Sequence, residues 1–250
     1  MPDWALAGLT QPGLPWLMAL AGLAGVVYGF AGFGSALIFM PLATIVVAPL
    51  LAVAAFAIAS LSAIFTVLPQ AWRASDRRAT LTMLAAALAV LPLGVWVLRT
   101  GDPVMLRWAV SAVVLATLAA LVTGWRYRQS PGVPAWLAVG GAVGFLGGSV
   151  GLNGPAMVLF QLGGSDSVDR TRANAIVVLT VSSAAYGPMI AAQGAFPPEA
   201  LTFGLAMAAP YGLGALLGRR LFDPARAGLY RRVAYGIIGA AALLGLPLWS

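Results

Sequence analysis

Two short apolar segments contain the residues best suited to bind a ligand. They are GFAGFGSA (29–36) and GSVGLNGPA (148–156). Each combines glycines with a residue that commonly precedes a helix as its N-cap: Ser35 in the first segment and Asn153, before Gly-Pro, in the second. The first turn of a helix has N–H groups without partners and about half a positive charge. Two such helix starts in apolar surroundings would form a neutral site with positive potential, suited to a small oxyanion.

Three amides and two arginines extend this candidate site. Amide side chains both donate and accept hydrogen bonds, which makes Gln70, Gln161 and Asn174 the best candidates among the other polar residues of apolar segments. Arg170 and Arg172 are expected either to guide an anion from the inner side of a membrane or to act only as topology determinants. The predicted substrate-binding residues are Gly32, Phe33, Gly34, Ser35, Gly151, Leu152, Asn153, Gly154, Pro155, Gln70, Gln161 and Asn174.

The absence of two residue types excludes much of enzyme chemistry. The chain has no His and no Cys, so disulfides, thiolate nucleophiles, imidazole acid–base catalysis and Cys/His metal sites are excluded. All seven acidic residues lie in loops or at the ends of apolar segments, which leaves no carboxylate for a proton relay inside a membrane. We therefore expect no catalytic residue, no metal and no cofactor.

The composition is that of a membrane protein. Of the 250 residues, 61% are hydrophobic and only 8% are charged, whereas soluble domains have about 25% charged residues. The net charge is +7, and all fourteen basic residues are Arg. They lie in short clusters between apolar segments, as membrane topology signals do, so the expected partner is the lipid bilayer and not nucleic acid. The N-terminal MPDWALAGLT has no basic segment, so no cleavable signal peptide is expected.

The charge-free segments define the expected spans. They are 4–72, 79–98, 108–125, 129–165, 173–198, 200–218 and 233–250. Most match the length of one transmembrane helix, which needs about 20 residues. The segment 129–165 is too long for one crossing, because a helix of its 37 residues would extend roughly 56 Å through about 30 Å of hydrocarbon. The chain must therefore break or turn back there, close to Asn153.

The chain also contains an internal duplication. An offset of 119 residues aligns 12–34 with 131–153 without a gap and matches several Pro and Gly residues. We therefore predict two homologous halves, 1–129 and 130–250. Each half has a broken helix or re-entrant hairpin (14–48 and 133–163) followed by three transmembrane helices. The expected spans are about 50–72, 79–99 and 103–125 in the first half, and about 172–192, 199–219 and 230–249 in the second.

The arginines indicate how the halves are oriented. If 14–48 and 133–163 are hairpins from opposite faces, twelve Arg lie inside and two outside. Eight single crossings would divide them nine to five instead. The positive-inside rule favours the first arrangement, which makes the halves inverted repeats. Broken single spans with parallel halves are the alternative. The glycine steps 22–25–29 and 141–144–148 are expected to pack helices closely together.

Three segments resemble the sulfite exporter TauE/SafE family of membrane permeases. They are GFAGFGSALIFMPL (29–42), GFLGGSVGLNGPAMVLF (144–160) and RTRANAIVVLT (170–180). The resemblance implies an all-α, multi-pass protein of the cell (inner) membrane. It also implies export or uptake of small sulfur-containing anions such as sulfite, sulfonates and related organic acids.

The predicted function is therefore secondary transport of a small anion. The substrate is most simply sulfite or another sulfur oxyanion, bound near the membrane midplane between the two broken elements. The alternatives are an anion channel and, less favoured, an intramembrane enzyme or a structural membrane subunit. An intramembrane enzyme would need a catalytic pair that the composition does not supply. The sequence is also compatible with a homo-oligomer.

Overall fold

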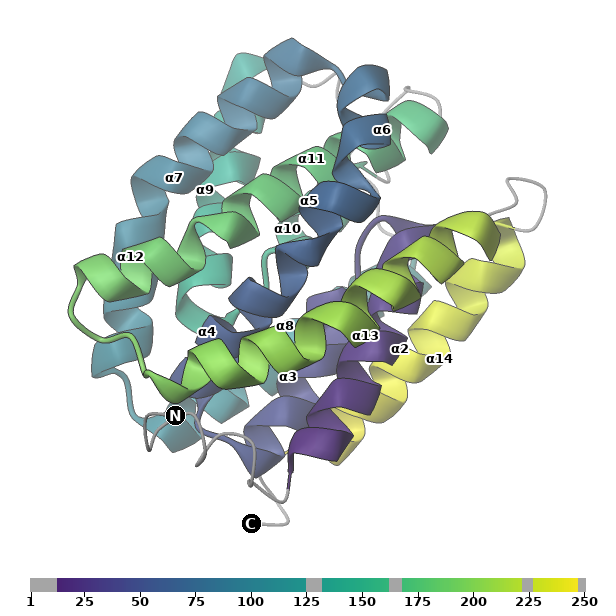
Figure 1. The fold of residues 1–250 in the computed structure, drawn as a ribbon. Coiled ribbons are helices and arrows are strands. Elements are labelled where there is room, and N and C mark those ends of the chain that lie inside the picture. The colour runs from purple at the N-terminus through teal and green to yellow at the C-terminus, as the bar shows by residue number, and fades with distance from the viewer. Residues whose placement is uncertain (1–12, 125–131, 162–167, 222–226, 247–250) are drawn as a thin grey trace.

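The structure is a computed structural model that describes residues 13–124, 132–161, 168–221 and 227–246. All regular secondary structure within these ranges is helical (Figure 1). In chain order the helices are α2 (Leu14–Ala31), α3 (Ser35–Val46), α4 (Pro49–Ser60), α5 (Ser62–Thr66), α6 (Leu68–Ala74), α7 (Arg77–Thr100), α8 (Pro103–Val122), α9 (Val133–Val150), α10 (Gly154–Gln161), α11 (Val168–Ala184), α12 (Tyr186–Ala192), α13 (Glu199–Leu221) and α14 (Ala227–Leu244). The predicted all-α fold is confirmed.

Seven helical segments in the described part of the chain are long and apolar enough to cross a membrane. They have 18 to 24 residues each, close to the length of about 20 that one crossing requires. Large apolar side chains cover their outer faces: Phe65 is 83% exposed and Met105 is 72% exposed. Such side chains on an outer surface are suited to lipid as the solvent. The chain is a multi-pass membrane protein.

Two aspartates explain why α7 and α8 begin where they do. The Asp76 carboxylate accepts hydrogen bonds from the backbone N–H groups of Arg78 and Ala79 at the start of α7. Asp102 does the same at the start of α8, where Pro103 occupies the first helical position. A carboxylate cap satisfies N–H groups that the helix leaves without partners, and it suits the positive end of the helix.

Glycines end α2 and α9 at two positions that lie 119 residues apart. Gly32 follows α2 with φ 78°, and Gly151 follows α9 with φ 73°. This left-handed conformation is available to glycine without steric cost. After the first turn the chain reverses, because α3 ends at Val46 so close to Gly13 that a Cβ at Gly13 would clash with the Val46 side chain. The α2–α3 pair is therefore a helical hairpin.

The helices α2 and α9 each pack on a long helix that is distant in the sequence. A Cβ at Gly25 or Gly29 in α2 would clash with the α13 backbone at Tyr211 or Ala215. A Cβ at Gly144 in α9 would likewise clash with the α7 backbone at Ala87. Figure 1 shows the α7–α9 pair and the α2–α13 pair in different parts of the bundle.

The close packing predicted for the glycine steps is therefore confirmed at Gly25, Gly29 and Gly144. It is also confirmed at Gly148, where an added Cβ would lie 2.9 Å from the carbonyl oxygen of Leu91 in α7. Gly22 and Gly141 differ, because an added Cβ there would meet only ordinary van der Waals contacts. The glycines that matter for packing are those that face the partner backbone directly.

Candidate functional site

A small buried cavity lies where the starts of α3 and α10 meet. A Cβ at Gly154, the first residue of α10, would lie 3.9 Å from the backbone nitrogen of Gly34, which precedes α3. The volume of the cavity is about 20 Å³, close to what one water molecule needs. The residues that line it are Tyr28, Gly34, Ser35, Ala36, Leu37, Met40, Val53, Phe56, Ala57, Ser60, Ala63, Gly151, Asn153, Gly154, Leu179, Thr180, Ser183, Tyr186 and Tyr211.

The start of α3 presents backbone N–H groups to this cavity. Gly34 occupies the N-cap position with φ 93°, and no side chain caps the helix. The prediction that Ser35 is the N-cap is therefore wrong by one position: Ser35 is the first helical residue, and its Oγ accepts a hydrogen bond from Tyr211 Oη at 3.3 Å. A left-handed cap position suits glycine, which has no side chain to satisfy the first N–H groups.

Asn153 fixes the corresponding chain segment directly before α10. It is 6% exposed, and its amide nitrogen donates to the Leu179 carbonyl at 3.2 Å and to Ser183 Oγ at 2.9 Å. Both acceptors belong to α11. The side chain thus attaches the start of α10 to α11, and its donors are already used by the protein.

Three tyrosines from different helices line the cavity: Tyr28 of α2, Tyr186 of α12 and Tyr211 of α13. Each is at most 3% exposed. Tyr28 Oη lies 2.7 Å from Thr180 Oγ1 and donates to the Ile176 carbonyl at 3.3 Å. None of the three was predicted from the sequence as part of the site. No spacing in the sequence shows that these three rings converge.

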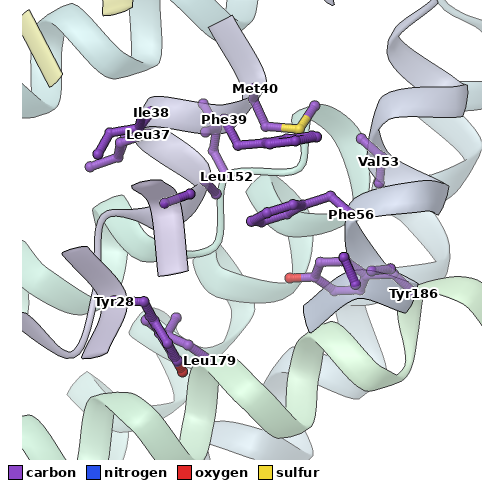
Figure 2. Close-up of a cluster of buried hydrophobic side chains, with 14 of the residues drawn as sticks. Tyr28, Leu37, Ile38, Phe39, Met40, Val53, Phe56, Leu152, Leu179 and Tyr186 are labelled. Atoms are coloured by element: carbon purple, nitrogen blue, oxygen red, sulfur yellow. The ribbon is translucent and has the colours of Figure 1, made fainter. Parts of the chain in front are cut away.

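The Tyr186 hydroxyl differs from the other two. It is buried and makes no hydrogen bond of normal geometry, although Asn153, Ser182 and Ser183 lie near it. Figure 2 shows the ring beside Phe56, with the hydroxyl pointing into the interior of the cluster. It occupies the space left by Gly147, where an added Cβ would clash with it. Such a donor is costly to bury unless something binds it.

The described residues that line the cavity include no charged side chain. Its polar groups are hydroxyls, the Asn153 amide and the backbone at the two helix starts. The arrangement resembles other helix starts that bind anions through N–H groups and the helix dipole. It can hold a negative charge without a formal counter-charge nearby.

A protein-family model described as sulfite exporter TauE/SafE matches residues 17–244. The match includes the starts of α3 and α10 and every described residue that lines the cavity. The chain belongs to the TauE/SafE family. It is therefore a membrane transporter of the permease type and not an enzyme. Comparison with curated proteins and comparison with solved structures gave no match.

The remaining residues predicted for the site of this TauE/SafE protein divide into two groups. Phe33, Leu152 and Pro155 flank the helix starts; Leu152 is completely buried in the apolar cluster that surrounds the cavity (Figure 2). Gln70, Asn174, Arg170 and Arg172 do not line the cavity. Gln161 is the last residue of α10, and its side chain lies outside the described residues.

Arg172 fixes the end of α2. Its Nη2 donates to the Gly29 carbonyl in the last turn of that helix, and a Cβ at Gly32 would lie 2.8 Å from its Cγ. A guanidinium at a helix C-terminus is stabilising because it meets carbonyls without partners and the negative end of the dipole. Arg170, two residues earlier in α11, is exposed.

Arg172 also lines a second pocket, of about 110 Å³, together with Gln70, Asp169 and Arg219. Arg219 Nη1 donates to the Thr66 carbonyl at 2.6 Å at the end of α5. Gln70 and Arg219 in addition line a wider pocket of about 510 Å³ with Arg73. Two of the predicted residues, Gln70 and Arg172, thus lie together, but in a basic pocket outside the central cavity.

Asn174 has a structural contact. Its Oδ1 accepts the backbone N–H of Asp76 at 2.8 Å, and the side chain is 6% exposed. This hydrogen bond joins α11 to the start of α7. Buried amides are usually satisfied in this way, and the sequence does not show which partner an amide will find.

Proposed function

We propose that this protein moves sulfite or a related sulfur-containing anion across the inner membrane through the central cavity. Family membership supports the class of substrate. The observation that carries the location is the approach of two helix starts, at Gly34 and Gly154, inside a buried cavity without charged side chains. Helix starts near the membrane midplane are a recurrent way for transporters to hold anionic groups.

The proposal includes two inverted repeats, residues 1–129 and 130–250, whose hairpins enter from opposite faces. Equivalent contacts support it. With the 119-residue offset, Gly32 corresponds to Gly151 and Arg172 to Val53. A Cβ at Gly32 would lie 2.8 Å from Arg172 Cγ, and a Cβ at Gly151 would lie 3.0 Å from Val53 Cγ2. The two turns thus rest on equivalent residues of the opposite half.

The basic pocket is the proposed access route from the inner side. Asp169, Arg172 and Ile176 of α11 line that pocket, while Leu179, Thr180 and Ser183 of the same helix line the central cavity. The steps of three or four residues place them on one face of α11. Tyr28 stands between the two spaces, because its hydroxyl binds Ile176 and Thr180. Arg172 and Arg219 would raise the local concentration of anions.

The size of the cavity favours a carrier over a channel. A volume of about 20 Å³ is too small for an anion with three oxygens unless the surrounding helices move. In alternating access one repeat moves against the other around a fixed site. The membrane potential would contribute a free energy of about 2.3 kcal/mol per 100 mV to the export of a monoanion.

The test is sulfite flux in proteoliposomes, together with thermal unfolding of the purified protein in detergent with and without sulfite. The wild type is expected to show saturable flux and a rise in Tm with sulfite. Ser35→Ala is expected to weaken both, whereas Ser75→Ala, the same change at a half-buried position outside the cavity, leaves both unchanged. The proposal would be overturned if neither sulfite nor a sulfonate were transported and neither stabilised the protein.

A further inference from the structure

We infer that the central cavity is selective for singly charged anions: it takes bisulfite or an organosulfonate and rejects sulfite and sulfate dianions. The inference rests on the proposed function, because it concerns the charge of the substrate at the same site. It follows from three observations: the positive charge available at the cavity, the location of the arginines of the basic pocket, and the buried Tyr186 hydroxyl.

The positive charge at the cavity comes from the two helix starts. Each helix N-terminus carries about half a unit of positive charge. The starts of α3 and α10 together supply about one unit, and the described lining residues add no cation. One negative charge is therefore balanced. A second would be left without compensation, and the desolvation cost of a dianion is about four times that of a monoanion of the same size, because this cost grows with the square of the charge.

The arginines of the basic pocket do not supply the missing charge. Arg172 contacts Gly32 and donates to the Gly29 carbonyl. Arg219 donates to the Thr66 carbonyl. Both line the basic pocket and neither lines the central cavity. An anion that passes Tyr28 thus leaves these two guanidinium groups behind and enters a site whose described side chains are all neutral.

The Tyr186 hydroxyl indicates that a polar ligand belongs in this space. Tyr186 lines the cavity and is 3% exposed, and its hydroxyl makes no hydrogen bond of normal geometry. It can donate to one oxygen of an anion. The lining Ser35, Ser60 and Ser183 hydroxyls can both donate and accept, so they also suit the S–OH of bisulfite. Tyrosine and serine hydroxyls are neutral near pH 7, so the charge of the site does not change there.

The experiment measures currents from wild-type proteoliposomes on a solid-supported membrane over a pH series that spans the second pKa of sulfurous acid. The apparent KM for total sulfite is expected to rise about tenfold per pH unit above that pKa, in proportion to the lost bisulfite fraction. Methanesulfonate, a monoanion throughout, controls for effects of pH on the protein and should keep a constant KM. Sulfate should neither be transported nor compete.

Two results would overturn the monoanion selectivity while leaving the proposed function intact. One is a KM for total sulfite that stays constant or falls as the pH rises. The other is sulfate competing as well as methanesulfonate does. If neither sulfite nor methanesulfonate is transported at any pH, the proposed function itself fails, and the two failures are therefore distinguishable.

A charge added to the cavity provides an independent test. Ser60 of α4 is 7% exposed and lines the cavity. Ser60→Lys is expected to let sulfate compete with methanesulfonate, whereas the neutral Ser60→Gln is not. A folded Ser60→Lys protein that binds methanesulfonate but still rejects sulfate would contradict the charge argument. The pH series on the wild type decides the question without this variant.

Discussion

The two helix starts at the central cavity follow turns of the same shape, but different contacts hold them in place. Gly32 and Gly151 end α2 and α9 with nearly equal φ values, 78° and 73°. The first hairpin is held by Arg172, which donates to the Gly29 carbonyl. The start of α10 is held by the neutral Asn153 amide, which donates to Leu179 and Ser183.

All these contacts involve α11. Arg172 of α11 reaches the end of α2, Ile176 and Thr180 of α11 bind Tyr28, and Leu179 and Ser183 accept from Asn153. At the 119-residue offset from Arg172, α4 has the apolar Val53. The comparison shows that glycine sets the backbone shape of both turns, while one helix of the second half holds both in place.

Loss of the arginine contact should have the largest effect. In Arg172→Met the charge-assisted hydrogen bond to Gly29 is lost, which should lower the free energy of unfolding by about 1.5–3 kcal/mol and abolish most sulfite flux. Arg78→Met, the same change at an exposed position at the start of α7, is the control. Chemical unfolding and flux measure the effects; equal behaviour of the two variants would show that Arg172 does not hold the first hairpin.

Loss of the Asn153 amide contact should have the second largest effect. Asn153→Ala removes buried hydrogen bonds to Leu179 and Ser183 of α11 and should cost about 1–3 kcal/mol of stability. Asn174→Ala removes another buried amide, the one that joins α11 to Asp76, and should cost a similar amount. Only Asn153→Ala should raise the KM for sulfite. A KM that rises equally in both variants would mean that general loosening of α11, and not the position of α10, sets the affinity.

The tyrosines allow a finer comparison, because Tyr28 has partners and Tyr186 has none of normal geometry. Tyr28→Phe should cost about 1 kcal/mol of stability. Tyr186→Phe should cost no stability, yet raise the KM about tenfold, since a lost ligand hydrogen bond is worth about 1.4 kcal/mol. Melting curves and flux kinetics separate the two; a less stable Tyr186→Phe protein with unchanged KM would assign that hydroxyl to the fold.

The smallest effect is expected where the two helix starts are made more alike. Ser35 corresponds to Gly154 in the duplication, and an added Cβ at Gly154 would have no neighbour closer than 3.9 Å. Gly154→Ser should therefore change stability by less than about 0.5 kcal/mol and leave sulfite flux close to wild type. A large loss of flux without loss of stability would show that the backbone at Gly154 must approach the substrate more closely than a serine permits.

The sequence predicted the features that depend on composition and local conformation. The low charge and the apolar segments predicted a membrane protein, which is confirmed. The glycine steps predicted close packing, and the structure shows it at Gly25, Gly29, Gly144 and Gly148. Close packing at a glycine can be predicted from the sequence because the need for glycine arises from the local backbone geometry.

The features that depend on which face of a helix meets which neighbour could not be predicted in this way. Gln70, Asn174 and Arg172 were chosen for their polarity, but polarity does not show whether a side chain meets a ligand or another helix. Tyr28 and Tyr211 are amphipathic residues within apolar segments, and they line the cavity only because α2 and α13 pack together. Ser35 was displaced from the N-cap position because Gly34 adopts the left-handed conformation.

The central claim, that an anion binds between the starts of α3 and α10, is tested most directly by a crystal structure with selenite in place of sulfite. Selenium scatters anomalously and marks the position of the ion. The account predicts an anomalous peak in the cavity between Gly34 and Gly154, within hydrogen-bond reach of Tyr186 Oη. A peak only in the basic pocket at Arg172 and Arg219, or no peak in the protein, would contradict it.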